Sequence, residues 1–358
     1  MKVSIIIPVK YINDYVREAV PLHLGLEYDD LEVLIFPDEV RDGDIKGLEA
    51  YAEVFSADVT KEELSGSKKR VFVIPSGETG PAEKRDLAFK YASGDIFAFT
   101  DDDAYPRTDW LTNAVKILER DASIGAVGGP AVTAPGDDIW KQAGGKVYES
   151  FLCSGGYTYR FIPGKYKEDD DIPSVNLIVK REVFEDVNGY DSTFYPGEDT
   201  KLCMDIVNSG KKLIYSPDVL VYHHRRSLFK GHLKQITNYA KHRGYFAKVL
   251  PQTSLRPAYF IPTLFTLGLV LGPIVCSILP ILWYLYFGVV ALYFLIAVIS
   301  LKSCFKDDLG YDYNPNALKY SFIYRLGLFV LALLGIISTH VGYGIFFVRG
   351  LLSKELLR

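Results

Sequence analysis

The segment DIFAFTDDDAYPRTDWL, residues 95–111, places three aspartates directly after a short apolar run. A short apolar run of this kind is typical of a strand buried in a parallel sheet. Adjacent carboxylates repel one another unless water or a cation lies among them. The segment therefore predicts a buried strand that presents Asp101, Asp102 and Asp103 at a polar edge.

The flanking sequence predicts an open, mostly parallel α/β sheet, because apolar strand-like runs alternate with helical patterns. In such sheets ligands bind beyond the carboxyl ends of the strands, where Asp38 is also expected. Strands are expected at 3–9, 31–36, 71–75, 95–100 and 124–130, and helices at 13–24, 81–92 and 110–120.

The composition argues against several classes of protein. The chain has 358 residues, a net charge of −4 and four cysteines without a CxxC pair. These features speak against a nucleic-acid binder, a disulfide framework and a zinc knuckle. The apolar run at the start is too short for a signal-peptide core, so a cytosolic first strand is expected.

The C-terminal third is strongly apolar. Residues 260–301 contain no charged side chain, and 326–348 are uncharged apart from His340. A membrane-spanning helix needs about 20 apolar residues, so two to three spans are expected at about 260–279, 281–301 and 325–348. The first two would be separated by a turn near Pro280. The alternative is a buried helical core.

Basic residues give the expected orientation in the membrane. Lys241, Arg243 and Arg256 precede the first span, whereas the turn near Pro280 carries no charge. The positive-inside rule then places residues 1–257 in the cytosol and makes the chain a multi-pass protein of the plasma membrane. Three full spans would put the basic 302–325 loop and the basic tail on opposite sides. A re-entrant or tilted third segment therefore remains open.

Two acidic clusters carry the candidate chemistry. Carboxylates at i and i+2, such as Asp101 and Asp103, can share Mg²⁺ or Mn²⁺ with a substrate's phosphates, although a solvated turn that caps a helix is the alternative. In YPGEDTKL, residues 195–202, Glu198 and Asp199 follow a Pro-Gly turn. One of them is a candidate general base. The alternative is simple charge matching at a helix N-terminus.

Over residues 1–226 the sequence resembles the inverting family 2 glycosyltransferases, which have the nucleotide-sugar-binding GT-A fold. The resemblance is carried by the order and spacing of SIIIPV, LIFPDE, GPAEKRDLAFKYASGDIFAFTDDDAYPRTDWL, VNLIVKREVFEDVNGYDSTFYPGEDTKL and YSPDVLVYHH. Some lipid- and polysaccharide-directed members also carry C-terminal membrane helices. The resemblance implies transfer of a sugar (a hexosyltransferase-type reaction) with inversion, dependent on Mn²⁺ or Mg²⁺.

The resemblance also implies roles for matching residues. Asp199 would be the general base with Glu198 beside it, and Arg85 would meet the donor's diphosphate. The nucleotide-sugar site would comprise Pro8, Val9, Lys10, Asp38, Arg85, Asp101, Asp102 and Asn176, with Asn176 facing the sugar. The metal ligands would be Asp101 and Asp103, completed by His223 or His224, although these two histidines are equally explained as a strand-end pair.

The sequence departs from the family pattern at three places. Asp38 is preceded by proline where a second acid is frequent, and Asp86 stands where asparagine is frequent. The Q-x-x-R-W signature of processive synthases has lost its arginine between Gln235 and Tyr239. Transfer of one sugar per visit is therefore expected.

The expected organisation is a GT-A domain over 1–230, an amphipathic interfacial segment over 231–258 and a membrane region over 259–358. The expected partners are a UDP-, GDP- or dTDP-linked sugar, a lipid-linked or cell-surface glycan acceptor and membrane lipids, with no nucleic acid. Two alternatives remain. One is a nucleotidyltransferase that makes an activated sugar, although PVKYINDY lacks the usual glycine-rich loop. The other is an inactive membrane-anchored scaffold.

Overall fold

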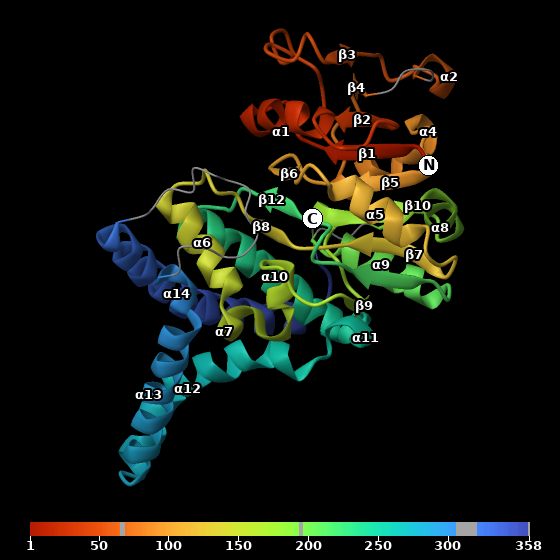
Figure 1. The fold of residues 1–358 in the computed structure, drawn as a ribbon. Coiled ribbons are helices and arrows are strands. Elements are labelled where there is room, and N and C mark those ends of the chain that lie inside the picture. The colour runs from red at the N-terminus through yellow and green to blue at the C-terminus, as the bar shows by residue number, and fades with distance from the viewer. Residues whose placement is uncertain (65–68, 193–195, 306–320, 357–358) are drawn as a thin grey trace. The chain divides into compact units, whose positions relative to one another are not determined.

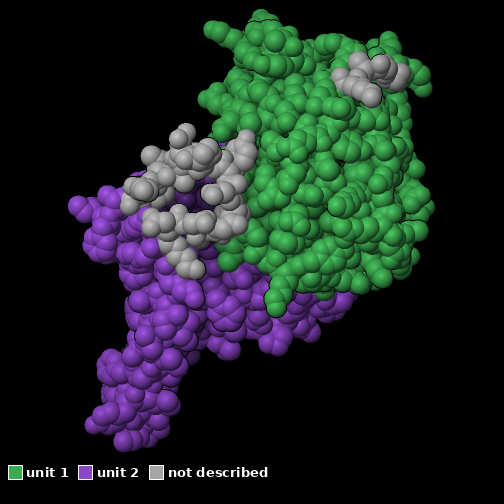
Figure 2. Space-filling model, viewed as in Figure 1, with its two compact units in different colours: residues 1–132, 162–223 green, residues 133–161, 224–358 purple. Residues whose placement is uncertain are grey.

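The computed structural model describes residues 1–64, 69–192, 196–305 and 321–356, which form two compact units (Figure 2). Unit 1 comprises residues 1–132 and 162–223, and unit 2 comprises 133–161 and 224–358. Residues 133–161, which the sequence assigns to the catalytic domain, thus belong to the same unit as the C-terminal helices.

Unit 1 is built on a nine-stranded, mostly parallel mixed sheet in the order β3-β4-β2-β1-β5-β10-β7-β11-β9 (Figure 1). The strands are β1 (Val3–Pro8), β2 (Leu31–Phe36), β3 (Ala52–Val54), β4 (Arg70–Val73), β5 (Ile96–Phe99), β7 (Ile124–Gly128), β9 (Lys167–Asp169), β10 (Leu177–Lys180) and β11 (Lys212–Tyr215). Three short strands lie outside this sheet, namely β6 (Ala104–Pro106), β8 (Ala131–Thr133) and β12 (Val221–His223).

Helices connect these strands: α1 (Asp14–Leu24), α2 (Lys61–Leu64), α3 (Pro81–Asp86), α4 (Ala88–Tyr91), α5 (Trp110–Leu118), the 3-10 helix η2 (Ser174–Asn176), α8 (Arg181–Asp186) and α9 (Glu198–Asn208). The continuous helix expected over 81–92 is instead two short helices, α3 and α4. Pro81 occupies the first turn of α3, as the sequence predicts.

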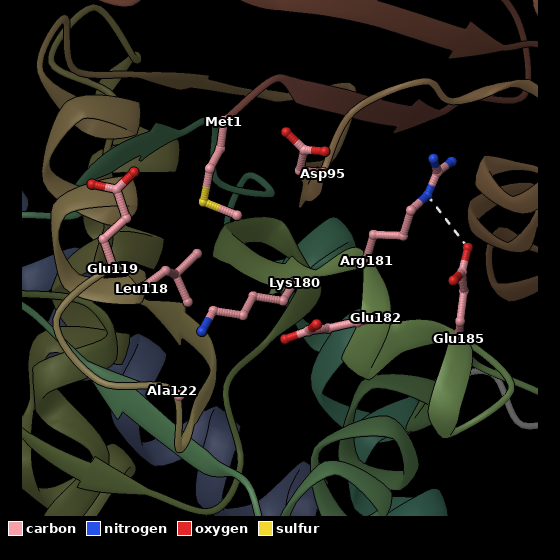
Figure 3. Close-up of a pocket in the computed structure, with 9 residues that line it drawn as sticks. All are labelled: Met1, Asp95, Leu118, Glu119, Ala122, Lys180, Arg181, Glu182 and Glu185. Carbon is pink, nitrogen blue, oxygen red and sulfur yellow. Dashed lines mark ion pairs between the residues drawn. The ribbon is translucent and has the colours of Figure 1, made fainter.

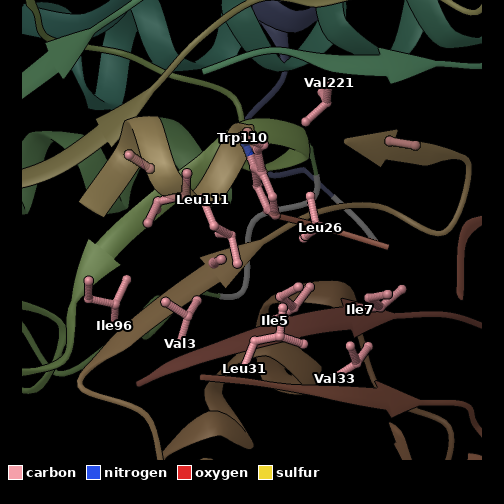
Figure 4. Packing of buried hydrophobic residues seen from close by; sticks show 14 of the residues in the cluster. Val3, Ile5, Ile7, Leu26, Leu31, Val33, Ile96, Trp110, Leu111 and Val221 are labelled. Carbon is pink, nitrogen blue, oxygen red and sulfur yellow. The ribbon is translucent and has the colours of Figure 1, made fainter. Parts of the chain in front are cut away.

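Both faces of the central strands are buried, which explains their continuous apolar runs. Alternate residues of β1, such as Val3 and Ile5, share one core cluster with Trp110 of α5 (Figure 4). On β5, Phe99 packs against Phe184 of α8, with ring centroids 5.2 Å apart. Since parallel β1 pairs with β2 and β5, the carboxyl ends of these strands meet at one edge.

Strand β10 is an antiparallel strand inserted between β5 and β7. Leu177 pairs with Phe99, the last residue of β5, so η2 lies at the same edge of the sheet as the three aspartates. We did not predict this strand from the sequence. Its pairing partners lie about 50 to 80 residues away in the chain, and a four-residue apolar run does not reveal strand direction.

Unit 2 is helical: α6 (Ile139–Glu149), α7 (Phe151–Ser154), η1 (Gly155–Arg160), α10 (Lys230–Val249), α11 (Pro251–Ser254), η3 (Pro257–Phe260), α12 (Ile261–Ile278), α13 (Leu282–Ser300), η4 (Lys302–Phe305) and α14 (Phe322–Leu352). Within the described part of the chain, three helical segments are long and apolar enough to cross a membrane: Pro257–Ile278, Leu282–Phe305 and Phe322–Leu352. They coincide closely with the expected spans.

Candidate active site

The three adjacent aspartates face three different partners in unit 1. Asp101 Oδ1 lies 2.7 Å from a terminal nitrogen of Arg85, and Asp103 Oδ1 lies 3.1 Å from His223 Nε2. Asp102 accepts a hydrogen bond from the side-chain amide of Asn13. The repulsion among the three carboxylates is therefore offset by separate donors that come from distant parts of the chain.

Asn13 connects Asp102 to helix α1. Its Oδ1 accepts the backbone N–H of Val16 at 3.0 Å and so caps the N-terminus of α1. Its amide group is then left to donate to Asp102. One side chain thus holds both the first helix and the middle carboxylate, a role that we did not predict from the sequence.

Arg85 is the centre of a buried ion-pair network. Its side chain is 4% exposed and joins Asp101 to Glu198 Oε1, which lies 3.1 Å away. The guanidinium group also lies over the ring of Tyr190, 5.4 Å from its centroid. The two carboxylates fix the position of this buried cation, which can form charge-assisted hydrogen bonds to an anion that takes the place of one of them.

Glu198 and Asp199 begin α9 but lie in different environments. Glu198 is 5% exposed, and burial, reinforced by the charge of Asp199, raises the pKa of Glu198 to about 7. Asp199 is half-buried and accepts backbone N–H groups of Thr200 at 2.8 Å and Ser174 at 3.4 Å. Of the two carboxylates, Asp199 is thus the more accessible from solvent.

The turn before α9 depends on a glycine. Gly197 has a φ of 121°, in a region that residues with a side chain rarely adopt. Its N–H donates to Glu198 Oε2 at 2.9 Å. The Pro-Gly pair that the sequence marks as a turn therefore also helps to hold the buried carboxylate against Arg85.

Lys84 is a buried residue beside the candidate site that sequence analysis missed. It is buried on α3, forms an ion pair with Asp38 and donates to the carbonyl of Val9 at 2.6 Å. Lys10 is exposed, and its carbonyl accepts the N–H of Asp38 at 3.1 Å. The ends of β1 and β2, with Pro8 as the last residue of β1, are thereby tied together. The signal available in the sequence was the position of Lys84 directly before Arg85.

Asn176 lies in the core of unit 1 rather than in an open site. It is 1% exposed; Oδ1 accepts from Trp110 Nε1 at 2.8 Å. Nδ2 donates to the carbonyls of Pro130 and Val219 at 3.1 and 2.7 Å. Both amide hydrogens are thus committed to backbone carbonyls. We therefore replace the expected sugar contact with a structural role for Asn176.

His223 and His224 face different partners. His223 lies against Asp103, whereas Nδ1 of His224 lies 2.7 Å from Asp137 Oδ1 within unit 2. We therefore keep only His223 as a candidate metal ligand. Among the described residues, no group of three or more histidine, cysteine or acidic side chains is placed to hold a metal ion.

The donor set nevertheless fits a divalent cation that is shared with a substrate. Asp103 and His223 are both largely buried, and their facing atoms are close enough to bind one ion. Mg²⁺ in particular is typically held by one or two carboxylates, with phosphates and water completing its shell. A site with few protein ligands is therefore chemically consistent with this geometry.

A chain of contacts supports Asp199 from behind. Asp86 accepts the backbone N–H of Tyr190 at 2.8 Å, and the Tyr190 hydroxyl lies 2.8 Å from the Ser174 hydroxyl. The N–H of Ser174 in turn donates to Asp199. Burial raises the pKa of Asp86 to about 6. The sequence offered one signal that Asp86 has this supporting role, namely that an acid stands where the family often has asparagine.

A cavity of about 480 Å³ lies at the other edge of the sheet (Figure 3). It is lined by Met1, by Asp95 just before β5 and by Lys180 at the end of antiparallel β10. These positions mark the amino ends of β1 and β5. The cavity is therefore separate from the carboxyl-end site that holds the aspartates.

The family model of Glycosyl transferase family 2 matches residues 4–187, just over half of the chain. The chain belongs to this family. A second model, Glycosyl transferase family group 2, matches residues 96–305. Membership of this family confirms the predicted family, fold class and type of enzyme.

Relatives with known activities are distant. The chain is 28% identical to a pre-mycofactocin glycosyltransferase of Mycobacterium tuberculosis over 41% of this chain and only 31% of that protein. It is 21% identical to a dolichyl N-acetyl-alpha-D-glucosaminyl phosphate 3-beta-D-2,3-diacetamido-2,3-dideoxy-beta-D-glucuronosyltransferase of Methanococcus voltae, over 68% of this chain and 73% of that protein.

A solved structure supports the GT-A fold. The mannosyltransferase of Pyrobaculum calidifontis, determined in complex with GDP-Man and Mn²⁺, aligns with a TM-score of 0.57 and 20% identity. The alignment covers 99% of this chain and 88% of that one. Unit 1 thus has the nucleotide-sugar-binding fold that the sequence predicts, and the apolar C-terminal helices are present as well.

Proposed function

We propose that the protein is a membrane-anchored, inverting glycosyltransferase that moves one sugar from a nucleoside diphosphate to a lipid-linked or glycan acceptor. The observation that carries this proposal is the Arg85 network beside Asp199. A buried cation adjoins the aspartates, and the accessible carboxylate of Asp199 stands next to its partner Glu198. This arrangement suits a single displacement at the anomeric carbon.

The donor would lie across the carboxyl ends of β1, β2 and β5. Its nucleoside would meet Pro8, Val9, Lys10 and Asp38, where Lys84 fixes the two strand ends. Its diphosphate would lie near Arg85 and the aspartates, with Asp101, the more exposed partner of Arg85, able to turn away. Arg85 would stabilise the charge that develops on the leaving nucleoside diphosphate.

Asp199 would act as the general base. It would remove the proton of the acceptor hydroxyl as that oxygen attacks the sugar on the face opposite the leaving group. The attack inverts the anomeric centre. Glu198 would hold Arg85 in place, because its carboxylate is buried and engaged by that cation.

Asp103 and His223 would hold Mn²⁺ or Mg²⁺, with Asp101 as a further ligand. When bound, the ion would neutralise negative charge on the diphosphate. The mannosyltransferase of similar fold was solved with Mn²⁺, which agrees with this expectation. The choice between the two ions is left to experiment.

A lipid-linked acceptor is supported by the apolar helices and by one relative. The three candidate spans would keep the site at a membrane, and the name of the M. voltae relative places a dolichyl phosphate in its acceptor. The basic residues of α10 suit contact with anionic headgroups. We place the catalytic unit on the cytosolic face of the plasma membrane.

The test is donor turnover by the purified chain in detergent. A panel of UDP-, GDP- and dTDP-linked sugars would be supplied with Mn²⁺ or with EDTA, beside Asp103→Ala. We expect metal-dependent release of one nucleoside diphosphate, lost in the variant. Metal-dependent nucleotide binding without turnover would point to a missing acceptor. Absence of both binding and turnover would contradict the proposal.

A further inference from the structure

Helix α14 differs from the other two apolar helices in what surrounds it. In the best 18-residue window of α14, 28% of the residues are buried within the protein, compared with 11% for each of the other two segments. Helix α14 packs against α6 and α10 as well as α12 (Figure 1). All of these helices belong to unit 2, so the comparison lies within one compact body.

The contacts of α14 run along its whole length. A Cβ added to Gly327 would lie 3.5 Å from Ile139 of α6, and one added to Gly335 would lie 2.6 Å from Val147 of the same helix. Near the other end, a Cβ on Gly350 would lie 1.9 Å from the carbonyl oxygen of Lys241 in α10. Helix α14 is therefore bound to α6 at its start and to α10 at its end.

These two partner helices are not membrane helices. Helix α6 carries a buried ion pair between Lys146 and Glu149, with 2.6 Å between charged atoms. Helix α10 carries basic residues throughout, namely Lys230, Lys234, Lys241, Arg243 and Lys248. A lysine or arginine at the centre of a membrane helix is strongly unfavourable on insertion scales.

The length over which α14 contacts α6 and α10 can be compared with the thickness of a bilayer. From Gly327 to Gly350 the helix rises about 35 Å, at 1.5 Å per residue. A hydrocarbon core is about 30 Å thick. If α14 crossed it, the charged helices bound along α14 would have to enter the hydrocarbon with it, where charged side chains are unfavourable.

We propose that α14 lies in the plane of the membrane, on the side that holds α6 and α10, and does not cross the bilayer. Its partner on the open face is the hydrocarbon just below the headgroups of that leaflet. Only the hairpin of α12 and α13 then inserts deeply. This inference concerns how the chain meets the bilayer and stands whichever donor and acceptor the enzyme uses.

The pattern of exposure on α14 agrees with this placement. Ile323, Leu334 and Ile345 are 81%, 49% and 54% exposed, and the spacing of 11 residues returns each to nearly the same face. The buried residues Ala332, Gly335, Thr339 and Gly350 lie on the opposite face. One face of α14 thus packs on protein while the opposite, apolar face is open, which an in-plane helix that rests on α6 and α10 requires.

The placement also accounts for the distribution of charge. The loop at 302–325 carries four lysines or arginines beside three aspartates, and the tail carries Arg349, Lys354 and Arg358. A crossing α14 would separate them across the membrane. An in-plane α14 leaves both on the side of α10, as the positive-inside rule requires.

Spin-label depth measurements test the proposal. Cysteines at Ile323, Leu334 and Ile345 would be labelled in the full chain reconstituted in vesicles, and the signal of the unsubstituted chain with its four native cysteines would be subtracted. Collisions with oxygen and with a water-soluble nickel chelate report depth. We expect equal, shallow depths at all three sites, with Leu271→Cys in α12 as a deep control.

A crossing helix gives a different profile, in which Leu334 is deepest and the other two sites lie near opposite surfaces. That profile would overturn the proposal. Labelling with a membrane-impermeant maleimide in sealed vesicles gives an independent measurement. Ser321→Cys and Lys354→Cys should react from the same face of the membrane, and reaction from opposite faces would also overturn it. Because neither readout needs turnover, failure of this proposal can be distinguished from failure of the proposed function.

Discussion

Replacing Glu198 by glutamine should remove a specific part of the pH dependence of stability. Burial, followed by the charge of Asp199, raises the pKa of Glu198 from its ordinary value of 4.5 to about 7. The folded state therefore binds a proton that the unfolded state has already released. The stabilisation that this gives is complete below pH 4.5 and is lost as the pH rises through 7.

The size of the effect follows from the difference between the two pKa values. Each unit corresponds to about 1.4 kcal/mol, so the loss between pH 4.5 and 8 amounts to roughly 3 kcal/mol. Glutamine resembles the protonated acid and can still accept from Arg85. As the pH rises from 4.5 to 8, the free energy of unfolding of Glu198→Gln should therefore increase by this amount relative to that of the unchanged protein.

The assay is apparent melting temperature in detergent without nucleotide or metal, measured from pH 4.5 to 8. For a domain of this size 1 kcal/mol moves the melting temperature by roughly 2–4 °C, so the two proteins should diverge by roughly 6–12 °C. Glu119→Gln, at an exposed position, is the matched control and should follow the unchanged protein. Parallel curves for Glu198→Gln and the unchanged protein would refute the reasoning.

Three further changes test the site and the packing. Asp199→Asn should lower turnover by about 10²–10⁴-fold while the donor's Kd, measured by calorimetry, stays within about twofold, because it removes only the base; a large rise in Kd would contradict this role. Lys84→Met leaves Asp38 nearly buried without its cation, so chemical denaturation should show a loss of about 3–5 kcal/mol, and an unchanged denaturation midpoint would contradict it. Gly350→Ala places a Cβ against a carbonyl of α10 and should lower stability by about 1–3 kcal/mol, whereas Gly268→Ala, with open space around it, should not; equal melting temperatures would argue against the close packing.

The fold was largely predictable because its strongest signals are local. Strand β2 was expected at its observed bounds, and the ends of β1, β5 and α5 differ from expectation by one or two residues. These elements are buried on a whole face or on both faces, so their sequence is continuously apolar or clearly periodic. Strand β10 and the grouping of residues 133–161 with unit 2 depend on long-range pairing, which no local pattern encodes.

The site was predictable in its residue types and less so in its contacts. The acids Asp101 and Asp103 after a strand end are a local signal, whereas the roles expected for Arg85 and Asp199 came from the family resemblance. The sequence could not show that the Asn176 amide donates to backbone carbonyls or that His224 faces Asp137. Lys84 was missed because a buried lysine is recognised only when its partner is known.

The apolar C-terminus shows most clearly where hydropathy stops being informative. Helices α13 and α14 lie in segments with similar mean hydropathy, 2.3 and 2.0, and each segment is long enough to cross a bilayer. The two helices differ in the neighbours that they pack against. Most residues of α13 are exposed, whereas α14 is bound to α6 and α10, which carry lysine and, in α10, arginine. Hydropathy measures whether a helix can enter hydrocarbon, but the charge on the helices packed against it decides whether it can cross.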